Sequence, residues 1–260
     1  LEHGARITDD VLVSGPGLEI AGQLGIKALN DLKYELIEKH DLFIVGSSDP
    51  QPAKVHDFVI VEAKRRQKRV IGVLDNWENF EKRWPLDLPD EIWTTDNYAF
   101  EIGKEVFKDR SISLVENPYI KDVRKKLEKD RNPDGSVLFL GSPNKRRDSQ
   151  AFQSNNDCLC EILDFLMAIY KGKRIVLRNH PSQKIIFCSE HKRDYGRERQ
   201  LHISNNAFLF QDLAKTSLVI GFPSYALFVA KELDFEVLAL GKFTVSGAPQ
   251  FTQLDLPDGL

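Results

Sequence analysis

The chain has 260 residues, of which 42% are hydrophobic and 29% are charged, and its formal net charge at pH 7 is −3. These proportions are typical of a globular protein and exclude an intrinsically disordered chain. A net charge so close to zero also argues against a dedicated nucleic-acid-binding protein, which would carry a basic surface. The length exceeds what one hydrophobic core usually organises, so we expect two domains.

The sequence contains no apolar stretch long enough to span a bilayer, and its first residues lack the basic and then apolar order of a signal peptide. We therefore expect a cytoplasmic protein. The cysteines Cys158, Cys160 and Cys188 lack the spacing of a zinc site or of a disulfide framework, so we expect reduced thiols and no bound metal. Because the first residue is Leu1, the sequence leaves open where the natural chain begins.

In the first half of the chain, short apolar runs alternate with segments of helical periodicity. The apolar runs are continuous, which is typical of strands buried on both faces of a parallel sheet. We predict strands at 11–13, 42–45, 70–74 and 92–95, a fifth at 112–115, and helices at 18–39, 53–68 and 98–107. This βαβ order predicts a Rossmann-like domain over residues 1–117.

A highly charged segment bracketed by Pro118 and Pro133 follows the first domain. We interpret residues 117–135 as a solvated connecting helix that marks the domain boundary. A second series then begins, with strands predicted at 137–140, 174–177, 201–203, 218–220 and 237–240 and helices at 151–170, 208–215 and 225–233. The sequence therefore predicts an α/β fold of two Rossmann-like domains, 1–117 and 135–260, whose parallel sheets face each other across a cleft.

Ligands of open parallel sheets bind at the carboxyl ends of the strands, because the following loops and helix N-termini collect there. In the second half, Ser224 and Tyr225 follow a predicted strand and begin a helix. The free N–H groups of a helix start, its dipole and the serine hydroxyl can together hold a phosphate. The alternative is that Ser224 only caps the helix.

Arg178 and His180 follow another strand of the second half, separated by Asn179 and ended by Pro181. A guanidinium beside an imidazole at a strand end suits a nucleotide phosphate, although a lone histidine is often structural. After the first strand of this half come Gly141 and Ser142, and a glycine there lets a ligand approach the backbone closely.

Two acidic residues in the first half are candidates for a general base. Glu19 lies in a loop of small residues after the first predicted strand, and Asp75 follows the third strand beside Trp77, which we expect to be exposed. Asp75 can equally cap the next helix. Asp96 is better explained as a helix N-cap, and the basic cluster at 64–69 as favourable charge at a helix C-terminus.

The order and spacing of these features resemble glycosyltransferases of the GT-B fold, in which two Rossmann-like domains face each other and the C-terminal one binds the nucleotide sugar. The likeness is to bacterial transferases that use CMP-activated acidic sugars of the sialic-acid or Kdo type. Their C-terminal domain carries a His-Pro motif and a serine motif at a helix start, and His180-Pro181 and Ser224-Tyr225 stand in these places. The resemblance implies that 1–117 binds the acceptor and 135–260 the donor.

From this resemblance we expect metal-independent transfer of a sugar to a glycan or surface-polysaccharide acceptor. Glu19 or Asp75 would deprotonate the acceptor, while Arg178, His180 and the helix start at Ser224 would stabilise the departing phosphate. We expect no cofactor and no nucleic-acid partner, and an acceptor of this kind is compatible with peripheral membrane association. Two alternatives stay open: a nucleotide-sugar epimerase or hydrolase of the same architecture, and a non-catalytic nucleotide-sugar-binding module.

Overall fold

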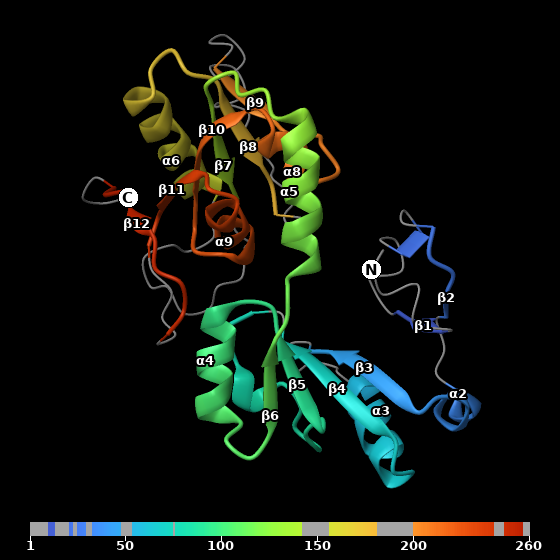
Figure 1. Cartoon of the computed structure of the whole chain (residues 1–260). Helices are drawn as coiled ribbons and strands as arrows, with labels where there is room; N and C mark the ends of the chain where they lie inside the picture. The colour runs from blue at the N-terminus through green and yellow to red at the C-terminus, as the bar shows by residue number, and fades with distance from the viewer. Residues whose placement is uncertain are drawn as a thin grey trace. The chain divides into compact units, whose positions relative to one another are not determined.

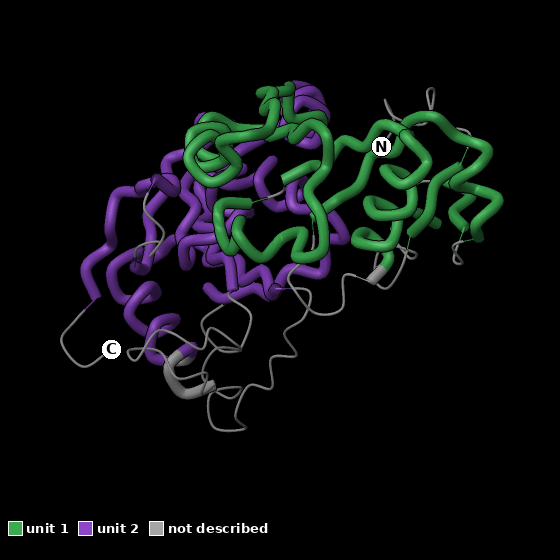
Figure 2. The backbone as a smooth tube through the Cα atoms, turned by 90° about the horizontal axis from the view of Figure 1, so that it is seen from below, with its two compact units in different colours: residues 1–118 green, residues 119–260 purple. Residues whose placement is uncertain are grey.

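The computed structural model of the chain describes residues 10–13, 21–22, 25–29, 33–47, 54–74, 76–141, 156–180, 200–241 and 247–256 (Figure 1). The chain divides into two compact units, which comprise residues 1–118 and 119–260 (Figure 2). Each unit contains a parallel sheet with helices packed on it, which confirms the predicted α/β fold. No described helix has the length and apolar character that crossing a membrane requires.

Unit 1, within its described residues, is built on a four-stranded parallel sheet in the order β3-β4-β5-β6. The strands are β3 (Leu42–Gly46), β4 (Arg69–Leu74), β5 (Glu91–Thr94) and β6 (Ser111–Leu114). The helix α3 (Lys54–Arg65) packs on β3 and β4, and α4 (Asn97–Val106) packs on β5 and β6. Neighbouring strands are consecutive in the chain, and crossovers between parallel strands are right-handed as a rule, so α3 and α4 lie on the same face of the sheet.

The region before β3 differs from the sequence prediction. Instead of one helix over 18–39, the described residues include a short strand β2 (Ala28–Leu29) and a helix α2 (Tyr34–Lys39). β2 pairs in parallel with β1 (Val11–Leu12). The apolar residues between 28 and 39 are therefore divided between β2 and α2. Their spacing along the sequence resembled that of a single helix, which is why one helix was predicted.

The connection between β4 and β5 carries a compact aromatic core around a short helical turn, η2 (Phe80–Lys82). Trp77, expected to be exposed, is only 2% exposed, and its indole N–H donates to Asp96 Oδ1 at 2.8 Å. The Trp84 indole packs directly against the backbone of β4 at Gly72, where an added Cβ would lie 2.6 Å from the ring. The loop after β4 is therefore held by buried rings, and Trp77 is part of this scaffold.

Unit 2 contains a six-stranded parallel sheet among its described residues, in the order β12-β11-β10-β7-β8-β9. The strands are β7 (Ser136–Leu140), β8 (Ile175–Arg178), β9 (Leu201–Ile203), β10 (Thr216–Gly221), β11 (Glu236–Ala239) and β12 (Thr252–Gln253). Numbered by chain order and read from β9, the arrangement is 3-2-1-4-5-6, the order of doubly wound nucleotide-binding sheets. The winding direction reverses between β7 and β10, so the topological switch point lies between these two strands.

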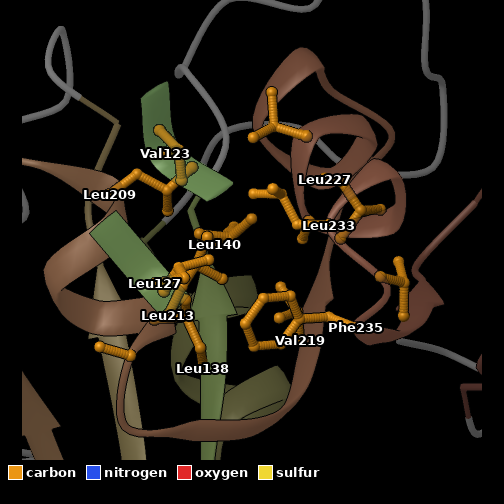
Figure 3. Close-up of a cluster of buried hydrophobic side chains, with 14 of the residues drawn as sticks. Val123, Leu127, Leu138, Leu140, Leu209, Leu213, Val219, Leu227, Leu233 and Phe235 are labelled. Carbon is orange, nitrogen blue, oxygen red and sulfur yellow. The ribbon is translucent and has the colours of Figure 1, made fainter. Parts of the chain in front are cut away.

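Both faces of the unit 2 sheet are covered, as the continuous apolar runs predict. One face packs against α6 (Asn156–Ile169) through Ile162, Leu163 and Leu166. The other face packs against α5 (Pro118–Asp130), α8 (Leu209–Leu213) and α9 (Tyr225–Glu232), whose apolar side chains converge in Figure 3.

The charged helix α5 occupies a different place from the one predicted. It forms as expected, but Val123 and Leu127 on its apolar face are 2% and 5% exposed and lie in the core of unit 2 (Figure 3). The guanidinium of Arg124 also reaches Asp234 at 2.9 Å, and that of Arg131 lies over the Phe235 ring. The helix is therefore an integral part of unit 2. Val123 and Leu127 are four residues apart, so they lie on one face of the helix and form an apolar face although most of the other residues are charged.

Candidate functional site

The carboxyl edge of the unit 2 sheet at the β7/β10 switch point is the candidate site. Here Gly221, the last residue of β10, lies opposite Leu140 of β7. A Cβ at position 221 would lie 2.9 Å from Leu140 Cβ and 3.0 Å from its carbonyl oxygen, so only glycine permits this approach. Gly141 follows β7, and its N–H donates to the carbonyl of Arg178 on β8 at 2.8 Å. Gly221 and Gly141 therefore bring no Cβ to this edge.

Ser224 begins α9 directly at this edge. Its backbone is extended, at φ −159° and ψ 164°, and its Oγ accepts a hydrogen bond from the N–H of Leu227 at 3.2 Å. The N-cap interpretation is therefore confirmed. The cap uses the hydroxyl oxygen as an acceptor, so the hydroxyl hydrogen can still be donated to a ligand, and the positive end of the helix dipole points the same way.

Arg178 is the last residue of β8, and its guanidinium is engaged within the protein. It donates to Asp212 Oδ2 at 2.7 Å and to the carbonyls of Asn206 and Ala207 at 2.9 and 3.2 Å. The Asp212 side chain is 2% exposed and also accepts hydrogen bonds from the Ser204 hydroxyl and the Asn206 amide. This pair of a partly buried arginine and a buried aspartate holds the β9–α8 connection against the end of β8. The charge of Arg178 is therefore largely balanced before any ligand arrives.

His180 and Asn179 follow β8 at the same edge. Burial lowers the pKa of the His180 imidazole, so the ring is neutral at pH 7 and acts there as a hydrogen-bonding group. The side-chain oxygen of Asn179 is buried and has no hydrogen-bond partner among the described residues. His180 therefore fits proton transfer or neutral hydrogen bonding better than the binding of phosphate as a cation.

Tyr119 is a residue at this edge that the sequence did not single out. It lies in the first turn of α5, and burial raises the pKa of its phenol although the residue is 45% exposed. The charge of Arg178 opposes that rise, while Tyr225 and Asp122 add to it, so these groups lie within electrostatic reach of the phenol. Tyr119 was not predicted as a site residue, because it belongs to α5, which the sequence indicated to be a connection outside both domains.

Of the residues singled out in the first half of the sequence, the structure describes only some. Asp96 caps α4 as expected, with Oδ1 accepting from the N–H of Ala99 at 2.8 Å. The basic cluster is engaged in ion pairs, which include Lys64 with Asp87 at 2.6 Å. Glu19, Asp75 and Ser142 lie outside the described residues, as do Cys188 and the side chains of Cys158 and Cys160. Among the described residues, no group of acidic, histidine or cysteine side chains is placed to hold a metal ion.

No protein-family model matches the sequence, and no curated protein matches it. Solved structures do match. The UDP-GlcNAc 2-epimerase of Methanocaldococcus jannaschii aligns at 13% identity with a TM-score of 0.52, covering 85% of this chain and 72% of the epimerase. A glycosyltransferase of Rickettsia africae aligns at 15% identity with a TM-score of 0.47, covering 87% and 69%. The β-Kdo 2,7-transferase KpsC of Thermosulfurimonas dismutans aligns at 11% identity with a TM-score of 0.34, covering 77% and 78%. The similarity to the epimerase extends to the fold alone.

Proposed function

We propose that the chain is a nucleotide-sugar-dependent glycosyltransferase whose donor binds at the carboxyl edge of the unit 2 sheet. The observation that carries this proposal is the 3-2-1-4-5-6 strand order, which puts Gly141, Gly221 and Ser224 together at the switch point. Doubly wound sheets bind nucleotides in this position, because the loops on either side diverge and leave backbone N–H groups exposed to a phosphate.

The proposed chemistry assigns distinct tasks to these residues. The start of α9 and the Ser224 hydroxyl stabilise negative charge on the departing phosphate, as preorganised dipoles that need no metal ion. His180, neutral through burial, donates a hydrogen bond to the leaving oxygen. A carboxylate of unit 1, Glu19 or Asp75, removes the acceptor proton. Arg178 supports the site by holding the β9–α8 connection against β8.

In its specific form the proposal names a CMP-linked acidic sugar as donor and a glycan or surface polysaccharide as acceptor. The arrangement of His180 with Pro181 and of Ser224 with Tyr225 supports this donor through the resemblance to CMP-sugar transferases. A second candidate is a nucleotide-sugar epimerase, which the shared fold with a UDP-GlcNAc 2-epimerase favours. The two candidates differ in nucleotide and in product, so both are testable.

The decisive first experiment measures thermal stabilisation of the purified protein by CMP, CDP, UDP, GDP and NAD. A ligand present at 100 times its dissociation constant stabilises the folded state by about 2.7 kcal/mol. We expect a shift with CMP that His180→Ala removes and His202→Ala, an exposed histidine on β9, retains. A shift with UDP alone contradicts the CMP donor and supports the epimerase candidate, and no shift with any nucleotide contradicts both.

A second experiment separates transfer from epimerisation. The protein is incubated with the stabilising nucleotide's sugar conjugate, with and without an oligosaccharide acceptor. A transferase releases free nucleotide in an acceptor-dependent manner. An epimerase instead changes the configuration of the sugar without needing an acceptor, and this result would overturn the transferase proposal.

A further inference from the structure

Asn179 stands out at the candidate site because its side chain has an unmet hydrogen bond. It follows β8 at the point where Leu140 pairs with Arg178 and the N–H of Gly141 closes the last ladder bond. Within the described part of unit 2, it alone has a buried side-chain nitrogen or oxygen without a hydrogen-bond partner. The polar side chains of Arg178, Ser204 and Asp212 close by bond to one another instead.

An unmet acceptor of this kind is costly. Leaving a buried polar group unpaired costs about 1–3 kcal/mol, and roughly nine in ten buried polar groups in proteins have a partner. An apolar side chain of similar size would avoid that cost. The side-chain oxygen of Asn179 lies one residue beyond β8, at the edge where ligands of parallel sheets bind. A bound ligand is therefore a reasonable source of its missing hydrogen bond.

The chemistry of the oxygen limits what that ligand group can be. A carbonyl oxygen only accepts hydrogen bonds, so it repels an ionised phosphate and pairs with a hydroxyl or an N–H. Its place also limits the choice, since β8 is the second strand of the 3-2-1-4-5-6 order. In doubly wound dinucleotide-binding folds, an acceptor side chain beyond the second strand bonds a ribose hydroxyl, while the phosphate lies at the first strand's loop.

We propose that the side-chain oxygen of Asn179 accepts a hydrogen bond from a ribose hydroxyl of the bound nucleotide and makes the site selective for ribonucleotides. This inference rests on the proposed nucleotide site and adds to it a specificity-determining residue.

The test compares CMP with 2′-deoxy-CMP and 3′-deoxy-CMP by isothermal titration calorimetry, on the wild type and on Asn179→Leu. If the thermal-shift experiment identifies a nucleotide other than CMP, the ribo, 2′-deoxy and 3′-deoxy forms of that nucleotide are used instead. We expect the wild type to bind one deoxy form about 10-fold more weakly than the ribonucleotide, the order of one buried hydrogen bond. Asn179→Leu should bind the ribonucleotide about 10-fold more weakly than the wild type does. The ratio of its affinities for the ribonucleotide and that deoxy form should fall to about 1.

A thermal readout separates this role from a structural one. Asn179→Leu removes an unpaired acceptor, so its melting temperature should equal or exceed that of the wild type. The matched control is Asn117→Leu, which removes a buried carboxamide whose Nδ2 donates to Thr95 Oγ1 at 3.2 Å in unit 1. That control should lower the melting temperature and leave the preference for the ribonucleotide unchanged.

Each result bears on the inference in a defined way. A wild type that binds a nucleotide but does not distinguish the deoxy forms overturns the role of Asn179 while leaving the nucleotide site intact. A lower melting temperature for Asn179→Leu, with unchanged preference, also overturns it by indicating a structural bond. If no nucleotide binds to the wild type, the proposed function and this inference fail together.

Discussion

His180 and Asp57 are two ionisable side chains whose charged forms are disfavoured by burial. Burial lowers the pKa of the His180 imidazole and raises the pKa of the Asp57 carboxyl, which lies on the buried face of α3 at 7% exposure. For Asp57, the attraction of the neighbouring His56 opposes this rise but is the smaller effect. Because the two groups titrate in different pH ranges, each makes a separate prediction about stability.

His180 should make the protein less stable in mild acid. Its pKa in the folded state lies below the ordinary value of 6.5, so the unfolded chain takes up the proton first as the pH falls. The stabilising contribution is complete above that value and is lost on acidification. Urea unfolding at pH 8 and pH 5.5 should therefore show a smaller decrease in His180→Gln than in the wild type. Equal decreases in the two proteins would contradict the assignment.

Asp57→Asn should stabilise the protein at neutral pH. The folded pKa of Asp57 lies above its ordinary value of 3.8, so its favourable contribution exists only at acid pH and is lost as the pH rises through the folded pKa. Removing the charge should raise the free energy of unfolding at pH 7 by about 1 kcal/mol, the order of one buried unpaired polar group. The difference should shrink toward pH 3 in denaturant titrations.

The matched control for Asp57 is Asp87→Asn in the same unit. Burial alone would raise the pKa of Asp87, but hydrogen bonds from the Lys64 ammonium and the Leu88 N–H outweigh it and lower the pKa. The same substitution should therefore destabilise the protein at pH 7. If both variants shift stability in the same direction, burial is not the cause of the Asp57 effect.

At the scale of single elements, the start of α9 combines a structural and a proposed binding role in Ser224. The cap on the N–H of Leu227 stabilises the helix, and the hydroxyl hydrogen and the helix dipole remain available to a phosphate. A side-chain cap does not by itself indicate a nucleotide site, since Asp96 caps α4 in the same way and no nucleotide site is assigned to it. The two roles of Ser224 can be separated by substitution.

Ser224→Ala and Ser224→Asp should affect stability and binding differently. Loss of the cap in Ser224→Ala should reduce the free energy of unfolding by about 1 kcal/mol, whereas aspartate is itself a good N-cap and should preserve stability. The added carboxylate should nevertheless abolish nucleotide binding by repelling the phosphate. Denaturant unfolding and calorimetry on both variants test this, and nucleotide binding by Ser224→Asp at wild-type strength would exclude a phosphate at this helix start.

At the scale of the whole molecule, each unit contains its own core, and α5 decides where unit 2 begins. Val123 and Leu127 of α5 are buried in the same cluster as Leu138 and Leu213 (Figure 3). Beyond the helix, the N–H groups of Asn132 and Asp134 also bond to the carbonyls of Ala214 and Lys215. The connection between the units therefore precedes the helix, although the charged sequence of α5 suggested that the helix was itself the connection.

Two fragments test this boundary. Residues 119–260 should unfold in one cooperative transition, because the fragment keeps α5 on its core. Residues 135–260 should lose about 4 kcal/mol from exposing the partners of two buried side chains, a large share of the stability of about 5–15 kcal/mol that a domain has. Near-UV circular dichroism and thermal unfolding distinguish them. Equal stability of the two fragments would show that α5 contributes nothing to the core.

The sequence by itself determined the elements that depend on local pattern. The ten strands predicted from continuous apolar runs, from 11–13 to 237–240, all have counterparts among the described strands. The prediction uses the rule that a strand covered on both faces is apolar throughout, which holds most fully for β7, whose five residues are all buried. The caps at Asp96 and Ser224 were likewise readable, since a cap involves residues only three apart. The short strand β12 was not foreseen, as two residues carry no recognisable period.

Only the tertiary structure decided which distant residues meet. The strand order, and with it the switch point at Gly141 and Gly221, depends on pairings between segments far apart in the chain. The pairing of Arg178 with Asp212 and the unmet acceptor of Asn179 likewise depend on neighbours that no local pattern specifies. Periodicity tells which side of an element is buried, but the partner that covers that side is chosen by packing across the whole unit.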